Sequence, residues 1–440
     1  MKHYPIWHPC TQMKDHEKYP LIKIVKGKGV YLYDDKGNSY IDAISSWWVN
    51  LFGHSNPRLN EALRKQAETI EHVIFANFVH EPALKLTDKL LKITPKNLTK
   101  LFFADNGSSA VEVAMKMSFG YFKNLGKIKN RFVYLDSGYH GETLGALSVC
   151  GEELYSEQYK EIMIPNIKVK GPDCFRCPFK KTRDTCNTEC FSFMEKALDE
   201  NKDKIAAVII EPMVNCAGGF KMYPADYLKK LRNLTAELGI HLIVDEIAVG
   251  FGRTGKMFAS EYASIEPDFM CLSKGITSGY MPLSVVLTTD DVYDAFYDDY
   301  TTLKAFLHSH SYTGNALACA LAVETLNIFE DENVLENNVE KYTYLSRLAK
   351  EYFKDYKFCG EVRSLGFITA VELVEDKTSK KPFDWKKRLG FQIYRNALKK
   401  GVLLRNLGDV IYFMPPYVIE KDEIEKMVKV AYESTREILG

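Results

Sequence analysis

The middle of the chain repeats one pattern, in which a short apolar run is followed by a polar turn and then by a helical stretch. Residues 225–238, ADYLKKLRNLTAEL, are one of the helical stretches between the runs. Continuous apolar runs that alternate with helices predict an α/β domain with a mostly parallel sheet covered on both faces. The runs are KLFFAD at 100–105, RFVYLD at 131–136, AAVIIEP at 206–212, HLIVDE at 241–246, FMCLS at 269–273 and SVVLTT at 284–289.

The two ends of the chain follow other patterns. Residues 28–44 alternate apolar and polar residues around the turn DDKGN, which predicts a β-hairpin. We predict a large domain at 56–330, a smaller α+β domain at 331–440, and an N-terminal segment at 1–55 that contributes to the smaller domain. The further predicted helices are 57–70, 83–91, 315–330, 335–355, 385–400 and 420–438, and the further predicted strands are FITAVELV at 367–374 and DVIYFMPP at 409–416.

Composition and charge narrow the class of protein. The chain has 440 residues, of which 46% are hydrophobic and 26% charged, and Lys+Arg and Asp+Glu both total 58. This balance does not favour nucleic acid or an acidic surface as a partner. The first residues, MKHYPIWHPC, contain no apolar signal segment, and no run of about 18 apolar residues occurs. We therefore expect a cytoplasmic protein that binds no membrane.

Two residues that close neighbouring apolar runs suggest the chemistry. Asp245 ends the run HLIVD, and Lys274 follows the run FMCLS. Ligands of such sheets gather beyond the carboxyl ends of the strands. A buried lysine has a lowered pKa, which favours the neutral amine that forms an imine. The pair would suit pyridoxal 5′-phosphate (PLP), with Lys274 holding it as a Schiff base and Asp245 keeping its pyridine nitrogen protonated. A helix cap and a solvated surface lysine are the alternative interpretations.

Two Gly-rich turns could complete a cofactor site. The segment NGSSA at 106–110 opens a helix, and free amides at a helix N-terminus bind phosphate, although an ordinary helix cap fits these residues equally well. The segment SGYHGET at 137–143 follows another apolar run, and its Tyr139 could stack on a cofactor ring or be an incidental turn residue.

Arginines and tryptophans could form a substrate pocket. Arg253 lies in the Gly-rich segment GFGRTG, and Arg405 precedes a turn and a strand. Each could bind a carboxylate, and a structural pair or a surface salt bridge is the alternative. The adjacent tryptophans of SSWWVN at 45–50 could line a cleft or belong to the core.

Four cysteines lie in the polar segment CFRCPFKKTRDTCNTEC. They are Cys174, Cys177, Cys186 and Cys190. Two close pairs would fit zinc or an iron–sulfur centre, but the spacing is not that of a standard zinc ribbon. Reduced or occasionally disulfide-linked cysteines are the favoured alternative, so we predict no metal here.

The segments VDEIAVGFGRTG, PDFMCLSKGITSGY and HSYTGNALACALA resemble the class III, or ω-type, aminotransferases of PLP fold type I, over essentially the whole chain. Within that family, WHPCTQMKD, SSWWVN, DSGYHGET and LRNLGDVIYFMPPY resemble the branch in biotin biosynthesis that converts 7-keto-8-aminopelargonate (8-amino-7-oxononanoate) to 7,8-diaminopelargonate (7,8-diaminononanoate). Other ω-aminotransferases, acting on acetylornithine, GABA or a diamine, are the alternative. The remaining alternative comes from a different class of protein. It is a cofactor-free or regulatory relative that uses the four cysteines to bind a metal.

The resemblance implies a role for each matching residue. Lys274 and Asp245 would be the catalytic pair, and a homodimer would share its active sites. For the cofactor, Gly107 and Ser108 would bind the phosphate, Tyr139 and Ile247 would contact the two ring faces, and Ser311 would reach the phosphate of the neighbouring subunit. For the substrate, Trp48, Tyr139, Arg253, Arg405 and Tyr412 would line the pocket, with Arg405 at the carboxylate.

One position departs from the family pattern. Many members have a tyrosine in the segment WHPYT, and this chain has Cys10 there. A cysteine supplies neither the aromatic wall nor the phenol hydrogen bond. The resemblance therefore leaves two amino donors open, S-adenosylmethionine and lysine.

Overall fold

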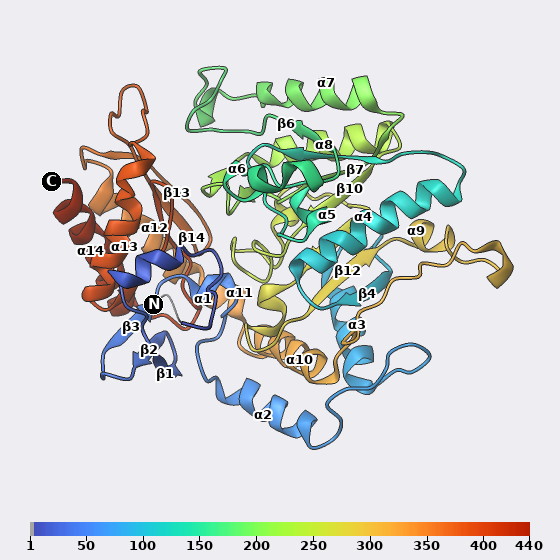
Figure 1. Ribbon diagram of the computed structural model, residues 1–440, viewed down its shortest axis with the longest axis horizontal. Helices are drawn as coiled ribbons and strands as arrows, with labels where there is room; N and C mark the ends of the chain where they lie inside the picture. The colour runs from blue at the N-terminus through green and yellow to red at the C-terminus, as the bar shows by residue number, and fades with distance from the viewer. Residues whose placement is uncertain (1–3) are drawn as a thin grey trace.

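The computed structural model describes residues 4–440, and its centre is a seven-stranded sheet (Figure 1). Three neighbouring strands, β11, β10 and β7, are buried at every position. The predicted mostly parallel sheet is confirmed. In spatial order the strands are β4 (Lys100–Ala104), β12 (Ser284–Thr288), β11 (Phe269–Leu272), β10 (His241–Asp245), β7 (Ile205–Ile210), β5 (Arg131–Leu135) and β6 (Ile167–Val169).

Strand β12 is the exception to the parallel arrangement, since it runs antiparallel to both of its neighbours. The connection from β11 to β12 contains only a short 3-10 turn, η6 (Lys274–Thr277). A parallel connection needs a crossover of about a dozen residues or more, usually a helix. The chain therefore turns back on itself, and the turn that reverses it carries Lys274.

Helices cover both faces of this sheet (Figure 1). Alternate residues of the strands point to opposite faces, so Ile243 packs with α4 (Gly107–Asn124) and Val244 packs with α8 (Ala225–Glu237) and α10 (Ala316–Asp331). Helix α10 also packs on α2 (Pro57–Ala67) and α3 (Glu81–Ile93). The shorter helices are α1 (Ser45–Trp48), α5 (Leu144–Leu147), α6 (Glu153–Ser156), α7 (Ser192–Asn201), α9 (Asp290–Asp294) and α11 (Val334–Asn337).

The N-terminal and C-terminal parts of the chain meet in a four-stranded sheet. The predicted hairpin is formed by β2 (Tyr31–Asp34) and β3 (Ser39–Asp42), with β1 (Ile24–Lys28) beside β2 and β15 (Val402–Leu403) parallel to β3. A second sheet has the order β13 (Cys359–Leu365), β14 (Ile368–Leu373), β17 (Val410–Phe413) and β16 (Asn406–Leu407), and a short hairpin pairs β8 (Val214–Asn215) with β9 (Lys221–Met222). The pairing of β3 with β15 agrees with a joint smaller domain, while the domain boundaries at 55 and 330 stay predictions.

The remaining helices are α12 (Val339–Phe353), α13 (Leu389–Lys399) and α14 (Lys421–Leu439). They match the three helical stretches predicted beyond residue 330. None of the helices within residues 4–440 combines the length and the apolar character needed to cross a membrane.

Candidate active site

Asp245 and Lys274 lie at the same edge of the central sheet. Strands β10 and β11 are parallel neighbours, with Asp245 opposite Cys271, so Lys274 follows close beyond the same edge. Asp245 is 3% exposed. The side chain of Lys274 is partly open to solvent but densely surrounded by protein, and this burial lowers the pKa of its amine, although the charge of Asp245 opposes the effect. A lysine that is readily neutral suits an amine that must react as a nucleophile.

The backbone of Lys274 is strained. Its φ of +47° lies in the left-handed region, which costs an L-residue other than glycine about 1–2 kcal/mol. Strain of this kind collects at functional sites, where the surrounding structure determines the conformation.

Asp245 is fixed by two hydrogen bonds. Its Oδ2 accepts from Nδ1 of His140 at 2.7 Å, and its Oδ1 accepts from the backbone N–H of Ile247 at 3.1 Å. His140 is 3% exposed, and its Nε2 has no hydrogen-bond partner within residues 4–440. We therefore infer that His140 orients the Asp245 carboxylate. Our sequence analysis missed this residue, although its place beside Tyr139, after an apolar run, was a signal for it.

Glu211 is a second buried carboxyl group that our sequence analysis missed. Its two oxygens accept from the backbone N–H groups of Tyr139 and Cys216, both at 3.0 Å. Burial, together with the negative charge of Asp245, raises the pKa of Glu211 to about 8. Glu211 fixes the backbone of Tyr139 through this bond, and its raised pKa weakens the negative charge that it adds beside Asp245.

The predicted phosphate and ring contacts come together around the start of α4. Asn106 caps this helix by accepting from the N–H of Ser109 at 3.0 Å, which leaves the amides of Gly107 and Ser108 at its open N-terminus. A Cβ on Gly107 would lie 3.1 Å from Ile247, and a Cβ on Gly141 would lie 2.1 Å from Oγ of Ser108. The approach at Gly141, whose φ is +123°, requires glycine, and a side chain at Gly107 would require Ile247 to shift.

These residues fit PLP. The amine of Lys274, the carboxylate of Asp245 and the amides at the start of α4 supply a group for the aldehyde, one for the ring nitrogen and one for the phosphate. Ile247 lies beside Gly107 at the start of α4, and the backbone N–H of Tyr139 donates to Glu211.

Trp48 and Tyr412 form an aromatic wall beside Lys274. The amine of Lys274 lies 5.0 Å from the ring of Trp48, and the indole N–H of Trp48 donates to the hydroxyl of Tyr412 at 3.1 Å. Arg405 lies next to the neighbouring tryptophan, with its guanidinium carbon 4.4 Å from the centre of the Trp47 ring. The predicted substrate residues Trp48, Arg405 and Tyr412 are thus brought together, and Trp47 joins them.

Helix α1, which carries both tryptophans, is a left-handed turn. The φ values of Ser45, Ser46, Trp47 and Trp48 are +50°, +46°, +75° and +71°. Such a turn costs about 1–2 kcal/mol per residue, so other contacts must hold it. We call these four residues the tryptophan turn.

Arg253 lies behind the tryptophan turn and is 1% exposed. Its guanidinium donates to the carbonyl oxygens of Trp48 at 3.2 Å, Asn50 at 2.9 Å and Pro415 at 2.9 Å. Of the two interpretations left open by the sequence, these bonds favour the structural one. Arg253 supports the wall that contains Trp48, and its predicted contact with a substrate stays a prediction.

Cys10 and Tyr139 meet at one carboxylate. The hydroxyl of Tyr139 donates to Glu142 at 2.8 Å, and Sγ of Cys10 lies 3.8 Å from the same oxygen. Burial and the negative charge of Glu142 raise the pKa of the Cys10 thiol, and the positive charge of Arg405 opposes this effect. Glu142 and Arg405 therefore give the pocket one negative and one positive group.

Ser311 lies apart from this cluster. It is exposed in the segment that follows His310, whose Nδ1 is 3.0 Å from the carboxylate of Asp105 at the end of β4. The contact of Ser311 with a neighbouring subunit stays a prediction.

The four cysteines of the 174–190 segment are half-buried, and the expectation that they hold no metal stays a prediction. All four are free thiols, and burial raises the pKa of Cys174 and of Cys190 to about 11. In the part of the chain that the structure describes, no three His, Cys, Asp or Glu side chains form a group that could hold a metal ion.

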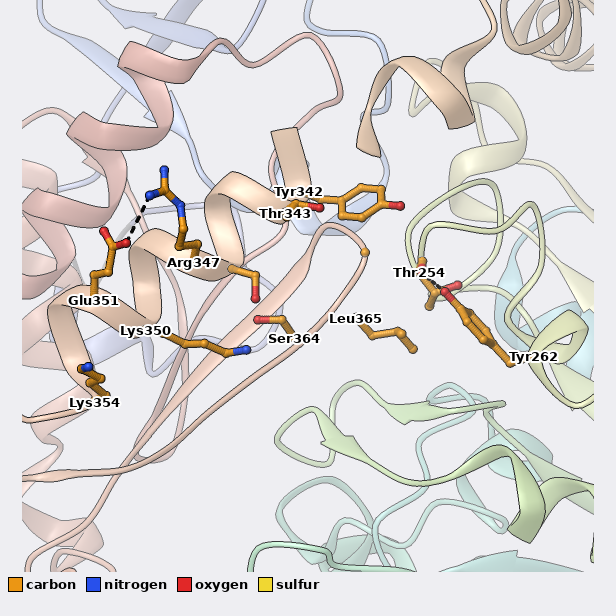
Figure 2. Close-up of a pocket in the computed structure, with 12 residues that line it drawn as sticks. Thr254, Tyr262, Tyr342, Thr343, Arg347, Lys350, Glu351, Lys354, Ser364 and Leu365 are labelled. Atoms are coloured by element: carbon orange, nitrogen blue, oxygen red, sulfur yellow. Dashed lines mark hydrogen bonds and ion pairs between the residues drawn. The ribbon is translucent and has the colours of Figure 1, made fainter. Parts of the chain in front are cut away.

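A cavity of about 670 Å³ lies away from Lys274, between α12, the turn that joins β13 to β14, and the loop of residues 254–262 (Figure 2). Tyr342 and Lys350 line one side and Thr254 the other. None of the predicted site residues lines this cavity. Its relation to the site is indirect, since Thr254 directly follows Arg253.

Comparisons with known proteins agree with this geometry. The family model described as "Aminotransferase class-III" matches residues 12–432. A relative from Helicobacter pylori, "Adenosylmethionine-8-amino-7-oxononanoate aminotransferase", is 44% identical over 428 residues, which cover 96% of this chain and 94% of the relative.

Solved structures agree as well. The enzyme of the same name from Methanocaldococcus jannaschii superposes with a TM-score of 0.94 at 36% identity, over 99% of this chain and 98% of that one. An amine transaminase from an uncultivated Pseudomonas species, in a PLP-bound form, has a TM-score of 0.94 at 30% identity, over 99% of each chain.

Proposed function

The chain belongs to the class III aminotransferases, which depend on PLP, and we propose that it converts 8-amino-7-oxononanoate to 7,8-diaminononanoate in biotin biosynthesis. One observation carries the proposal. The reactive pair of Lys274 and Asp245 lies beside an aromatic wall that ends at Arg405. The names of the relatives from H. pylori and M. jannaschii support the same substrate.

The residues around Lys274 would hold the cofactor and move the proton. The amides of Gly107 and Ser108 would bind the phosphate, and Tyr139 and Ile247 would contact the two faces of the ring. Asp245, oriented by His140, would hold the proton on the ring nitrogen. When bound, PLP stabilises the electron pair left on a carbon that loses its proton. In the first half-reaction the amine of Lys274 would move that proton from the carbon of the amino donor to the cofactor, and in the second it would move a proton from the cofactor to the former carbonyl carbon of the keto substrate.

The keto substrate would lie along the tryptophans. Arg405 makes no ion pair or hydrogen bond with another residue between 4 and 440, and one face of its guanidinium contacts Trp47. Its N–H groups are therefore available for the substrate carboxylate, which two parallel hydrogen bonds recognise best. Trp48 would contact the carbon chain between this carboxylate and the reacting carbonyl, and Tyr412, which is 0% exposed, would hold the Trp48 ring in place by accepting from its indole N–H.

The amino donor would lie near Glu142. S-adenosylmethionine carries a sulfonium and lysine a second ammonium, and the carboxylate of Glu142 beside Cys10 suits either positive charge. The names of the relatives favour S-adenosylmethionine. Cys10 is small where an aromatic wall is expected, so the geometry itself favours neither donor.

A second function is supported by the structural similarity to other transaminases. The ω-transaminase of Pseudomonas jessenii in complex with PMP superposes with a TM-score of 0.93 at 31% identity, over 98% of this chain and 97% of that one. The alternative is therefore an ω-aminotransferase that acts on acetylornithine, GABA or a diamine. The two proposed functions differ only in the substrate that binds along the aromatic wall and to Arg405.

The two functions differ in a direct assay. We expect the purified enzyme to form 7,8-diaminononanoate from 8-amino-7-oxononanoate when it is given S-adenosylmethionine or lysine, and to convert acetylornithine, GABA and diamines at least about 100-fold more slowly. Absorbance of the bound cofactor then identifies the donor, because only a true donor converts it to its amine form. Turnover of the alternative substrates without turnover of 8-amino-7-oxononanoate would refute the proposal.

We also propose that the enzyme is a homodimer. Large apolar side chains are strongly exposed in two segments, 74–79 and 300–312, and a monomer seldom leaves so many uncovered. The second segment includes Ser311. Members of this exposed set are Ile74 (61%), Phe78 (60%), Val79 (57%), Tyr300 (92%), Leu303 (82%), Leu307 (91%) and Tyr312 (65%).

The dimer has a simple test. Light scattering should give twice the chain mass of 50.3 kDa. The double variant Leu303→Asp/Leu307→Asp should give the single mass, because it places charge on the exposed apolar set. The matched control is Leu154→Asp, whose side chain is 87% exposed outside the two segments and should leave the mass doubled. A single mass for the unaltered protein would refute the dimer.

A further inference from the structure

The tryptophan turn connects the two ends of the candidate site. Its two tryptophans are consecutive in sequence, yet Trp48 lies 5.0 Å from the amine of Lys274 and Trp47 lies 4.4 Å from the guanidinium carbon of Arg405. One ring thus faces the reacting centre, and the next faces the group that would bind the carboxylate. The conformation of this turn therefore sets how the substrate chain lies between them.

A buried carboxylate holds the turn in its left-handed conformation. Asp42 is 0% exposed and lies at the end of β3, three residues before the turn begins. Its Oδ1 accepts from the backbone N–H of Ser46 at 2.9 Å and of Ile44 at 3.3 Å, and its Oδ2 accepts from the hydroxyl of Ser46 at 2.6 Å. These bonds fix the first half of the turn from one side.

His54 completes the network. Its Nδ1 is 3.1 Å from the side-chain nitrogen of Asn50, which can only donate, so the Nε2 carries the proton and donates to Asp42 at 3.0 Å. The carbonyl oxygens of Trp48 and Asn50 in turn accept from Arg253. The turn is therefore held at its start by Asp42 and at its end by Arg253.

We propose that Asp42 is a positioning residue for the keto substrate, which it affects through the tryptophan turn without touching substrate or cofactor. The inference rests on the proposed function, because it concerns the substrate that lies along Trp47 and Trp48. The hydrogen bonds that hold Asp245 come from His140 and Ile247 and do not involve the turn. Loss of the Asp42 carboxylate therefore weakens binding of the keto substrate and leaves the reaction with the amino donor intact.

The test is Asp42→Asn, with the two half-reactions measured separately. Asparagine keeps the size of the side chain, but its nitrogen cannot accept from Ser46 and His54. We expect the KM for 8-amino-7-oxononanoate to rise at least about tenfold, while the rate at which the amino donor converts the bound cofactor stays within about twofold of the unaltered enzyme. A milder variant, Ser46→Ala, removes one of the bonds from an exposed residue and should raise the same KM about threefold.

Asp34→Asn is the matched control. Asp34 is 6% exposed in the same small sheet and accepts from the backbone of Lys36 and Asn38 and from the hydroxyl of Tyr40, but it does not contact the turn. It should leave both half-reactions within about twofold even where it lowers the melting temperature. A rise in KM in Asp34→Asn equal to that in Asp42→Asn would overturn the proposal, because it would show general loosening of the sheet.

Two further outcomes separate the inference from the proposed function. An unchanged KM in Asp42→Asn and in Ser46→Ala, or an equal loss in both half-reactions, would overturn the role of Asp42 while the proposed function stands. If the unaltered enzyme fails to convert 8-amino-7-oxononanoate, the proposed function is wrong. The KM comparison is then made with the carboxylate-bearing keto compound that the enzyme does use.

Discussion

Replacing Lys274 with alanine is expected to slow amino transfer by about 10⁴-fold or more, because one side chain supplies both the covalent attachment of the cofactor and the proton transfer. Its position supports this size of effect. The amine is buried enough for its pKa to be lowered, and it lies beside Asp245 on one side and Trp48 on the other. Steady-state rates and single half-reactions should both fall, since each half-reaction needs the same proton transfer.

Two measurements make this result specific. Reduction with borohydride should attach the cofactor to the peptide that contains Lys274 in the unaltered enzyme and to no peptide in Lys274→Ala. The matched control is Lys129→Ala, which removes another partly buried lysine whose amine donates to the carbonyl oxygen of Gly239 far along the chain. That variant should keep its rate within about threefold. Near-normal turnover by Lys274→Ala would contradict the assignment of this lysine.

The central pair could be predicted from the sequence because its geometry follows from local pattern. The apolar runs HLIVD and FMCLS identify buried strands, and parallel neighbours present their carboxyl ends at one edge. The residues that follow such strands therefore meet, whatever the rest of the fold. The start of α4 was predictable for the same reason, since NGSSA follows β4 directly.

His140 and Glu211 could not be predicted in this way because their contacts depend on strand order. Strands β5, β7 and β10 are neighbours in space but far apart in sequence. Only this order brings His140, beyond β5, to Asp245 at the end of β10. The antiparallel direction of β12 had one signal in the sequence, which is the short segment between the apolar runs at 269–273 and 284–289.

The tryptophan turn was beyond sequence analysis for a different reason. Left-handed backbone is usually indicated by glycine or asparagine, and SSWW contains neither. Contacts from Asp42 and Arg253, which lie outside the turn, determine its conformation. Because this conformation could not be predicted, the contact between Trp47 and Arg405 could not be predicted either. The structure places the guanidinium of Arg405 over the Trp47 ring.

Asp245→Asn is expected to lower the rate of both half-reactions by about 10²–10³-fold, as removal of one preorganised electrostatic group does in other active sites. The change keeps the size of the side chain. Its remaining oxygen can still accept from the N–H of Ile247, so the site should keep its shape. What is lost is the negative charge that would hold a proton on the ring nitrogen, and both half-reactions depend on that proton.

The pattern of this loss distinguishes Asp245 from the residues of the substrate wall. Asp245→Asn should reduce the donor and keto-substrate half-reactions by similar factors, whereas Asp42→Asn should change only the second. The matched control is Asp268→Asn, because Asp268 lies at the opposite end of β11, where it accepts from the N–H of Leu242 at 2.7 Å and from Arg232 at 2.6 Å. That variant should lower the melting temperature and leave the rates within about threefold. A loss confined to the keto-substrate half-reaction in Asp245→Asn would show that this carboxylate serves substrate binding, because a residue that holds the proton on the ring nitrogen must affect every step that uses the cofactor.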